Sequence, residues 1–399
     1  MPQRKLRLGV MGLGRAFSLM VPTLAHHPAI EVVAGTDVRP EARERFAHEF
    51  AARAHASAEA LCEDPHVEAV YISTPHEFHA AQAQLAASRR KHILVEKPMA
   101  LTLANCNAMI AAAHAAGVVL MVGPSHSFDA PIARTRELIA GGSFGALRMI
   151  HALNYTDWLY RPRRPEELDP QAGGVLVNQA PHQVDAVRLI AGGQATRVRA
   201  SVGAWDRSRP APAAYSAHLT FADGAFASLS YSGYGHFDTD EFSGWVGESG
   251  EDKDQRRYGH ARARLAALAN AGQEAAIKAA GNYGGADYKG PAASAHATAR
   301  HHQHFGLLIA SCERADLRPG PDGITIYEDT GVRVEPLPPP AVPRAEVIDE
   351  LYAAVVDGHP PLHDGVWSRA TMEVCLAMIE SAQTGKEITL AHQTSVPFA

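Results

Sequence analysis

Short apolar runs, each about the length of a buried strand, alternate with stretches of helical periodicity along the first 125 residues. Leu6–Met11 predicts the first strand, and apolar positions from Leu19 to Leu24 predict a helix after it. Further strands are predicted at 31–37, 69–73, 92–96 and 118–122, and helices from about Pro40, after His76 and before Val118. Strands that alternate with helices at this spacing predict an α/β domain with a parallel, doubly wound sheet.

The pattern changes from about Ser125. Residues 147–160 have strand-like alternation, and residues 180–190 have helical periodicity. Residues 214–235 predict a hairpin with the turn signal Asp223-Gly224. Antiparallel strands with a few helices predict a C-terminal α+β domain whose open, mainly antiparallel sheet has one covered face.

These patterns divide the chain into a first domain at 1–124 and a second at 125–399. The second contains an unusual segment at about 238–300, with a charged stretch, an alanine-rich stretch at 261–280 and a glycine-rich stretch after it. The alanine-rich stretch predicts one helix. We interpret the segment as an insertion in the sheet domain, with a lid, an oligomer arm and a disordered excursion as the alternatives.

Composition narrows the class of protein. A chain of 399 residues is too long for one ordinary core, and 46% hydrophobic with 20% charged residues is typical of a globular protein. The net charge of −6 gives no general attraction to nucleic acid or anionic membrane. No apolar run has membrane-spanning length, the N-terminus has no signal-peptide core, and the four cysteines are scattered. We therefore expect a cytoplasmic location.

A glycine pair predicts the cofactor. Gly12 and Gly14 lie between a strand and a helix, where backbone N–H groups bind the pyrophosphate of a dinucleotide. Asp37 ends the second strand, where a carboxylate binds ribose hydroxyls and repels a 2′-phosphate, so NAD is favoured over NADP. Arg39 partly offsets that repulsion. Phe17 stands where the motif usually has a small residue, so the helix must sit slightly differently against the strand.

Two further loops follow predicted strands. "STPHEFH" follows the third strand and "EKP" the fourth, at the carboxyl ends where open α/β sheets bind ligands. Glu96 and Lys97 therefore lie beside the predicted nicotinamide, although a solvated ion pair is the ordinary reading of such neighbours. The predicted cofactor-binding residues are Gly12, Gly14, Arg15, Ala16, Asp37, Arg39, Thr74, Pro75, His76, His79, Glu96 and Lys97.

These motifs, with "GGVLVNQAPHQVD" later in the chain, resemble the glucose–fructose oxidoreductase, inositol dehydrogenase and MocA family. The resemblance covers both predicted domains. It implies that Lys97 is catalytic, in a peptide that is often cis. It also implies a homodimer or homotetramer that forms through the open sheet face.

The motif "GGVLVNQAPHQVD" contains the other residues that we predict to take part in the chemistry. At helical spacing Asn178, His182 and Asp185 share a face. The family has Asp and Gly where this chain has Asn178 and Ala180, whereas His182 and Asp185 match. An amide takes no proton, so we expect Asn178 to orient the substrate. His182 is predicted to be catalytic with Lys97, one as base and one positioning the hydroxyl, and the sequence does not assign which.

The arginines of "NYTDWLYRPRRPEELD" bear on the substrate. Arginine forks bind carboxylates in a bidentate manner, so this cluster predicts an anionic substrate, with surface solvation as the alternative. The stretch resembles a narrower group, the phthalate 4,5-cis-dihydrodiol (4,5-dihydroxyphthalate) dehydrogenases of aromatic catabolism. The predicted substrate-binding residues are Asn178, Asp185, Arg161, Arg163, Arg164 and His126.

The resulting prediction is an NAD(P)-dependent dehydrogenase that moves hydride from a carbinol carbon of a cis-dihydrodiol to NAD and yields a catechol. A sugar or inositol dehydrogenase of the same family is the alternative enzyme, and a catalytically silent nicotinamide-binding sensor is the alternative of another class. "HHQH" at 301–304 raises a metal site, but we predict none, because this type of alcohol oxidation needs no metal. No nucleic-acid or membrane partner is expected.

Overall fold

The computed structural model describes residues 4–268, 270–288, 290 and 300–396. The chain forms two compact units, each assembled from separate segments. The first comprises Met1–Pro124, Ala279–Thr298 and Ala341–Met372; the second comprises Ser125–Lys278, Ala299–Pro340 and Glu373–Ala399. Two later segments, Ala279–Thr298 and Ala341–Met372, therefore group with the first unit. The domain boundary at residue 124 and the insertion at about 238–300 remain proposals.

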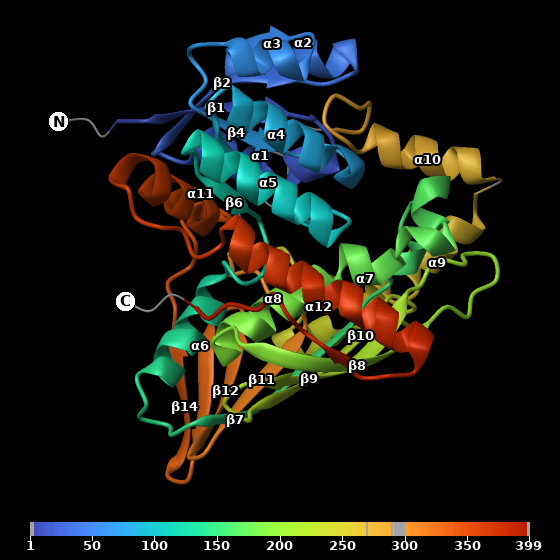
Figure 1. Ribbon diagram of the computed structural model, residues 1–399. Coiled ribbons are helices and arrows are strands. Elements are labelled where there is room, and N and C mark those ends of the chain that lie inside the picture. The colour runs from blue at the N-terminus through green and yellow to red at the C-terminus, as the bar shows by residue number, and fades with distance from the viewer. Residues whose placement is uncertain (1–3, 269, 289, 291–299, 397–399) are drawn as a thin grey trace. The chain divides into compact units, whose positions relative to one another are not determined.

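The first unit contains a six-stranded parallel sheet in the order β3-β2-β1-β4-β5-β6 (Figure 1). This order reverses at β1 and β4, as in a Rossmann domain, and it confirms the predicted fold class. The strands are β1 Leu6–Met11, β2 Ile30–Thr36, β3 Arg53–His55, β4 Ala69–Ile72, β5 His92–Val95 and β6 Leu120–Val122. Strand β3 was not predicted, because this short edge strand has little apolar signal.

Helices connect these strands. Thr102 and Ser57 begin two of them by accepting hydrogen bonds from backbone N–H groups of the first turn. The helices are α1 Arg15–His26, α2 Pro40–Phe50, α3 Ala58–Glu63, α4 His79–Ser88 and α5 Leu103–Ala116, with a 3-10 turn η1 at His76–Phe78. A later segment adds α11 Ala345–Tyr352 and a π-helical turn at Ala353–Asp357, and the division between the units falls within α12 Gly365–Thr384.

Phe17, the departure from the usual glycine motif, is fully buried in an aromatic cluster. Its ring lies 5.9 Å from the rings of Phe46 and Phe50 and 4.8 Å from that of Tyr283. Tyr283 comes from the glycine-rich stretch that follows the alanine-rich one, and its N–H donates to Ser18 Oγ. A late part of the chain therefore packs on helix α1 and covers the large side chain.

The second unit is built on a nine-stranded mixed sheet in the order β14-β13-β12-β11-β7-β10-β9-β8-β15. Among the described strands of this sheet, β7 and β10 alone pair in parallel, and the other pairs are antiparallel. The predicted hairpin is present, with Gly224 at φ +89° in its turn. The strands are β7 Leu147–Tyr155, β8 Ala195–Gly203, β9 Ala214–Phe221, β10 Phe226–Ser232, β11 Leu307–Cys312, β12 Ala315–Gly320, β13 Gly323–Glu328, β14 Gly331–Pro336 and β15 Ile388–Thr389.

Helices cover one face of this sheet (Figure 1). Helix α6 (Ala130–Ala140) packs on β12 and β13, α7 (Gly174–Asn178) on β9, and α8 (Ala180–Ala191) on β7 and β10. The side chains of the other face alternate outward and include Phe226, Tyr327, Val332 and Val334. Strand β7 ends at Tyr155, because the chain then turns into a 3-10 turn at Trp158–Tyr160, so the expected strand to residue 160 was too long.

In its described residues the alanine-rich stretch forms two α-helices, where its pattern predicted one. Helix α9 is His260–Ala266 and α10 is Ala271–Ala280. Asn270 separates them, and its side chain accepts a hydrogen bond from the N–H of Gln273 in the first turn of α10. Asparagine competes with the helical backbone in this way and favours a cap over a helix interior.

Candidate active site

The turn after β1 has the geometry of a pyrophosphate-binding loop. Gly12 has φ +86°, and a Cβ there would lie 2.8 Å from Thr74 Cγ2, so only glycine fits. Around Gly14 a Cβ would meet nothing within 4 Å, which leaves space before the first turn of α1. Arg15 and Ala16 form that first turn. Backbone N–H groups at a helix N-terminus bind phosphate, so this loop fits a dinucleotide.

Asp37 lies directly after β2 and faces the same turn. Its Oδ2 accepts the N–H of Leu13 at 2.7 Å, and its Oδ1 accepts the N–H and Nε–H of Arg39, both at 2.9 Å. The Arg39 guanidinium also donates to Leu13 O at 2.7 Å and to Tyr283 O at 3.1 Å. Arg39 is therefore held by Asp37 and by backbone carbonyls, in a position that ties the Tyr283 segment to the glycine loop.

The loops after β4 and β5 are linked through a buried histidine. His79 lies with Nε2 2.9 Å from Thr74 O and Nδ1 2.9 Å from Pro98 O, and burial lowers its pKa. His76 begins the 3-10 turn beside Pro75, and its ring lies 5.6 Å from that of His79. His79 thus holds two of the predicted cofactor loops together.

Glu96 and Lys97 diverge at the end of β5. Glu96 is buried and accepts a 2.6 Å hydrogen bond from the hydroxyl of Tyr71, and burial raises the pKa of this carboxyl. Lys97 is part-exposed and precedes Pro98 through a cis peptide bond. The two side chains of the predicted pair therefore differ in burial: the carboxyl lies in the core of the first unit, and the lysine lies at its surface.

In the second unit, His182 belongs to a cluster of rings. His182 is the third residue of α8, and its ring lies 4.8 Å from that of His126 and 5.3 Å from that of Phe305. Phe305 also lies 5.1 Å from His126 and stacks on Tyr231 at 6.0 Å. These four side chains, His126, His182, Phe305 and Tyr231, are called the histidine cluster below.

His126 is buried between two carboxylates. Its Nδ1 lies 2.6 Å from Asp129 Oδ2, and its Nε2 lies 3.5 Å from Glu248 Oε1. Burial alone would lower the pKa of His126, but Asp129 and Glu248 outweigh it and raise that pKa to about 9. The ring beside His182 is therefore an imidazolium at neutral pH.

Asp185 lies within α8, and Asn178 is the last residue of the short helix α7 that precedes it. The Asp185 carboxylate accepts hydrogen bonds from the hydroxyls of Ser125 and Ser127 and is buried. Asn178 ends α7, and its Nδ2 donates to Gly174 O at 3.3 Å. Asp185 thus ties α8 to the segment that carries His126, while Asn178 remains half-buried at the turn between the two helices.

The three predicted arginines have different surroundings. Arg163 stacks on the Trp158 ring at 3.9 Å and donates to Trp158 O at 2.6 Å, and burial lowers its pKa to about 10. Arg164 is exposed, 3.7 Å from Glu167. Arg161 is about half exposed, donates to Asp157 at 2.7 Å and lines a cavity. Of the three arginines, Arg161 remains a candidate for binding the substrate.

The histidines of "HHQH" point to separate partners. His301 Nδ1 lies 2.6 Å from Asp322, His302 Nε2 2.8 Å from Pro338 O and His304 Nε2 2.9 Å from Val246 O. Among the described residues, no group of three or more potential ligands is assembled for a metal ion.

Several members of this site were not predicted from the sequence. Asp129 follows His126 by three positions, a spacing that would have indicated a pair. Phe305, Tyr231 and Glu248 gave no such signal, because strands and loops far apart in the chain bring them to His126 and His182.

Comparison with known proteins defines the class. Residues 6–124 match the oxidoreductase family with an NAD-binding Rossmann fold, and residues 132–250 match the GFO/IDH/MocA C-terminal domain. The chain belongs to the GFO/IDH/MocA oxidoreductase family and is an NAD-dependent dehydrogenase. The open glycine turn and Asp37 fit this cofactor.

The names of individual relatives specify reactions more narrowly than the family description does. The chain is 46% identical over 383 residues, 95% of both proteins, to the 1-carboxy-3-chloro-3,4-dihydroxycyclohexa-1,5-diene dehydrogenase of Comamonas testosteroni. It is 32% identical over 203 residues to the trans-1,2-dihydrobenzene-1,2-diol dehydrogenase of Mus musculus, covering 50% of this chain and 60% of that protein. A solved structure named "putative dehydrogenase" from Bordetella bronchiseptica RB50 matches with a TM-score of 0.89 and 41% identity, over 96% and 100% of the two chains.

Proposed function

We propose that this dehydrogenase oxidises a carboxylated cyclohexadiene cis-diol to the corresponding catechol. The observation that carries the proposal is the 46% identity, along 95% of both chains, to a dehydrogenase whose name specifies a carboxylated, dihydroxylated cyclohexadiene. Phthalate 4,5-cis-dihydrodiol, with two ring carboxylates, is the first substrate to test. Arg161, which lines a cavity of the second unit, supports an anionic substrate.

Oxidation of a carbinol requires two transfers. Bound NAD supplies the acceptor carbon for the hydride that leaves the carbinol carbon. The chain must remove the hydroxyl proton and hold the hydroxyl, and we assign these two tasks to Lys97 and His182. The resulting hydroxyketone tautomerises to a catechol, and aromatisation draws the oxidation forward.

The other cofactor and substrate residues have supporting roles in this proposal. We propose that Asp37 binds the adenosine ribose and that NAD is preferred over NADP, because Arg39 is already held by Asp37 and two carbonyls. We propose that His79, Glu96 and Asp185 position loops and helices, since their polar atoms are engaged within the protein.

A substrate panel tests the proposal. Purified protein with NAD is offered phthalate 4,5-cis-dihydrodiol, a monocarboxylated cyclohexadiene cis-diol, myo-inositol and common aldoses, and the absorbance of reduced nicotinamide is followed. Turnover of a carboxylated diol supports the proposal. Faster turnover of myo-inositol would favour the sugar or inositol dehydrogenase alternative, and binding of NAD with no turnover of any substrate would favour the sensor.

The oligomeric state and the cellular location of the protein remain predictions. Phe226, Tyr327, Val332 and Val334 give the uncovered sheet face an apolar character, which supports its proposed role in a homodimer or homotetramer. Within the part of the chain that the structure describes, no helix is long and apolar enough to cross a membrane. The cytoplasmic location is still an expectation from the sequence.

A further inference from the structure

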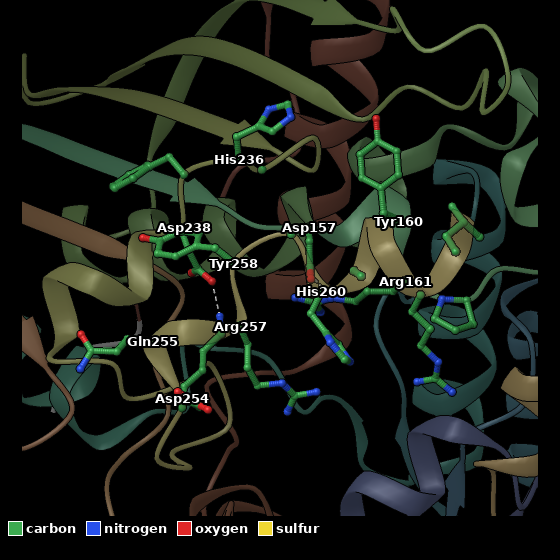
Figure 2. A pocket seen from close by; sticks show the side chains of 18 of the residues that line it. Asp157, Tyr160, Arg161, His236, Asp238, Asp254, Gln255, Arg257, Tyr258 and His260 are labelled. Carbon is green, nitrogen blue, oxygen red and sulfur yellow. Dashed lines mark hydrogen bonds and ion pairs between the residues drawn. The ribbon is translucent and has the colours of Figure 1, made fainter. Parts of the chain in front are cut away.

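A cavity of about 210 Å³ lies within the second unit (Figure 2). Its walls come from three segments: residues 157–162 after β7, residues 235–238 after β10, and residues 245–268 of the proposed insertion. In the view of Figure 2, Arg257 and Tyr258 lie on one side and Arg161 on the other, with Asp157 and His260 between them. The insertion therefore supplies one wall of the cavity, and the arginine-bearing loop supplies another.

The lining is positively charged in a protein whose net charge is −6. Each of its three carboxylates already has a cationic partner: Asp157 pairs with Arg161, Asp238 with Lys253, and Asp254 with Arg256. Arg257 and Arg264 also line the cavity and add positive charge to it. Guanidinium groups at a partly enclosed site select carboxylates.

Aromatic side chains form a second feature of the cavity. The rings of Trp245 and Tyr258 meet edge to face at 5.3 Å, and Phe237 lines the wall nearby. Aromatic faces of this kind pack against a flat ring. Cations beside aromatic walls favour a ligand that combines a planar ring with a carboxylate.

Trp245 is held in a strained conformation. Its φ is +65°, in the left-handed region that a bulky residue rarely adopts. Two backbone hydrogen bonds keep it there, from Trp245 N–H to Asp240 O at 2.9 Å and from Lys253 N–H to Trp245 O at 2.8 Å. Strain of this kind is concentrated at ligand-binding sites, where the surrounding structure maintains it.

Arg161 connects the cavity with the histidine cluster. Its charge interacts with Glu248, which contacts His126, and with Tyr231, which stacks on Phe305. The Arg161 guanidinium thus lines the cavity and acts electrostatically on groups in and beside the histidine cluster.

We propose that this cavity binds the carboxylate-bearing part of the substrate, an aromatic or cyclohexadiene acid. The chemical class rests on the proposed function, whereas the location rests on the cavity itself. The insertion is then a specificity element, with Arg257 and Arg264 recognising the carboxylate and Trp245 and Tyr258 packing against the ring.

Binding is tested first, without turnover. Titration calorimetry compares 3,4-dihydroxybenzoate with catechol, which has the same ring and no carboxylate. We expect the acid to bind the wild type more tightly, and the Arg257→Met/Arg264→Met double variant to lose about tenfold or more of that affinity. Arg89→Met is the matched control: it removes an exposed arginine whose partner is Glu63, neither residue lines the cavity, and it should leave binding unchanged.

Kinetics then tests the assignment to the substrate. In the double variant, the KM for a carboxylated cis-diol should rise about tenfold or more, while the KM for cis-1,2-dihydrobenzenediol and the Kd for NAD stay constant. In the wild type, 3,4-dihydroxybenzoate should inhibit in competition with the carboxylated diol.

Three results would overturn the proposal: equal affinity for acid and catechol, unchanged acid affinity in the double variant, or simultaneous binding of acid and diol. A wild type that turns over no carboxylated diol, yet binds the acid through Arg257 and Arg264, would contradict the proposed function alone. A wild type that turns over the diol with the same KM as the double variant would contradict the cavity proposal alone.

Discussion

At the scale of single residues, Lys97 is the test of the proposed chemistry. Its part-exposed side chain follows β5 beside a carboxyl that turns into the core. We expect Lys97→Ala to lower kcat by about 10²- to 10⁴-fold, the usual contribution of a positioned acid or base, while the Kd for NAD changes little. Steady-state kinetics and NAD titration measure both.

Lys97→Arg is the matched control, because it keeps the charge but gives up no proton at ordinary pH. It should be as inactive as the alanine variant. Undiminished turnover in either variant would remove this lysine from proton transfer. His182→Ala should lose activity to a similar extent if His182 is the base, and less if it only orients the hydroxyl.

Asp37 governs the choice of cofactor. Its carboxylate is held toward the glycine turn by Leu13 and Arg39, so Asp37→Ala should remove a ribose acceptor and release the guanidinium. We expect NAD binding to weaken by about tenfold, and NADP binding to weaken less or to improve. Calorimetric titration with both cofactors checks this; a wild-type preference for NADP would contradict our interpretation of Asp37 and Arg39.

His126 predicts a pH dependence of stability. Its folded-state pKa of about 9 lies above the ordinary 6.5, so the folded protein holds this proton more tightly than the unfolded chain. The associated stability, on the order of 3 kcal/mol, is fully present below about pH 6.5 and is lost as pH rises toward 9.

Denaturation midpoints across this range measure the effect, with His126→Gln as the comparison. The variant should be less stable than the wild type at pH 6.5 and should show a flatter decline toward pH 9. Parallel pH profiles for the two proteins would show that His126 is not charged in the fold.

At the scale of elements, a buried ion pair anchors the insertion. The Arg209 guanidinium donates to both Glu274 oxygens of α10, at 2.6 and 3.0 Å, and both side chains are almost fully buried. Glu274→Leu should destabilise α10 by about 3–5 kcal/mol, because it leaves Arg209 buried without its partner. Hydrogen exchange of α10 reports this loss.

The Arg209→Met/Glu274→Leu double variant is the matched control. It removes both charges and should recover most of the protection, since apolar side chains replace the pair at little cost. Equal exchange in the single and double variants would mean that the pair does not hold the helix.

The elements show where sequence patterns suffice. The first strand was predicted with its observed bounds, because its apolar run and the glycine after it are local signals. The break between α9 and α10 depends on one asparagine in an otherwise helical run, and the end of β7 on a turn in an aromatic stretch that alternates like a strand. Weak local signals of this kind do not define boundaries.

At the scale of the whole molecule, the sequence predicted the fold class of both parts but not which chain segments form each part. The Tyr283 segment and the segment from Ala341 return to the first unit, and Phe17 makes sense only with Tyr283 beside it. In the same way, Glu248 and Phe305 join His126 from loops far along the chain. Such contacts follow from tertiary packing, which leaves no periodic trace in the sequence.

Hydride transfer from a carboxylated cis-diol is the central claim, and isotope labelling tests it most directly. A carboxylated cyclohexadiene cis-diol deuterated at its carbinol carbons is oxidised with NAD, and the products are measured by mass spectrometry. We predict one deuterium on the reduced nicotinamide for each catechol acid formed, and no such product in Lys97→Ala. Unlabelled reduced nicotinamide, or a wild type that oxidises only neutral polyols, would contradict the account.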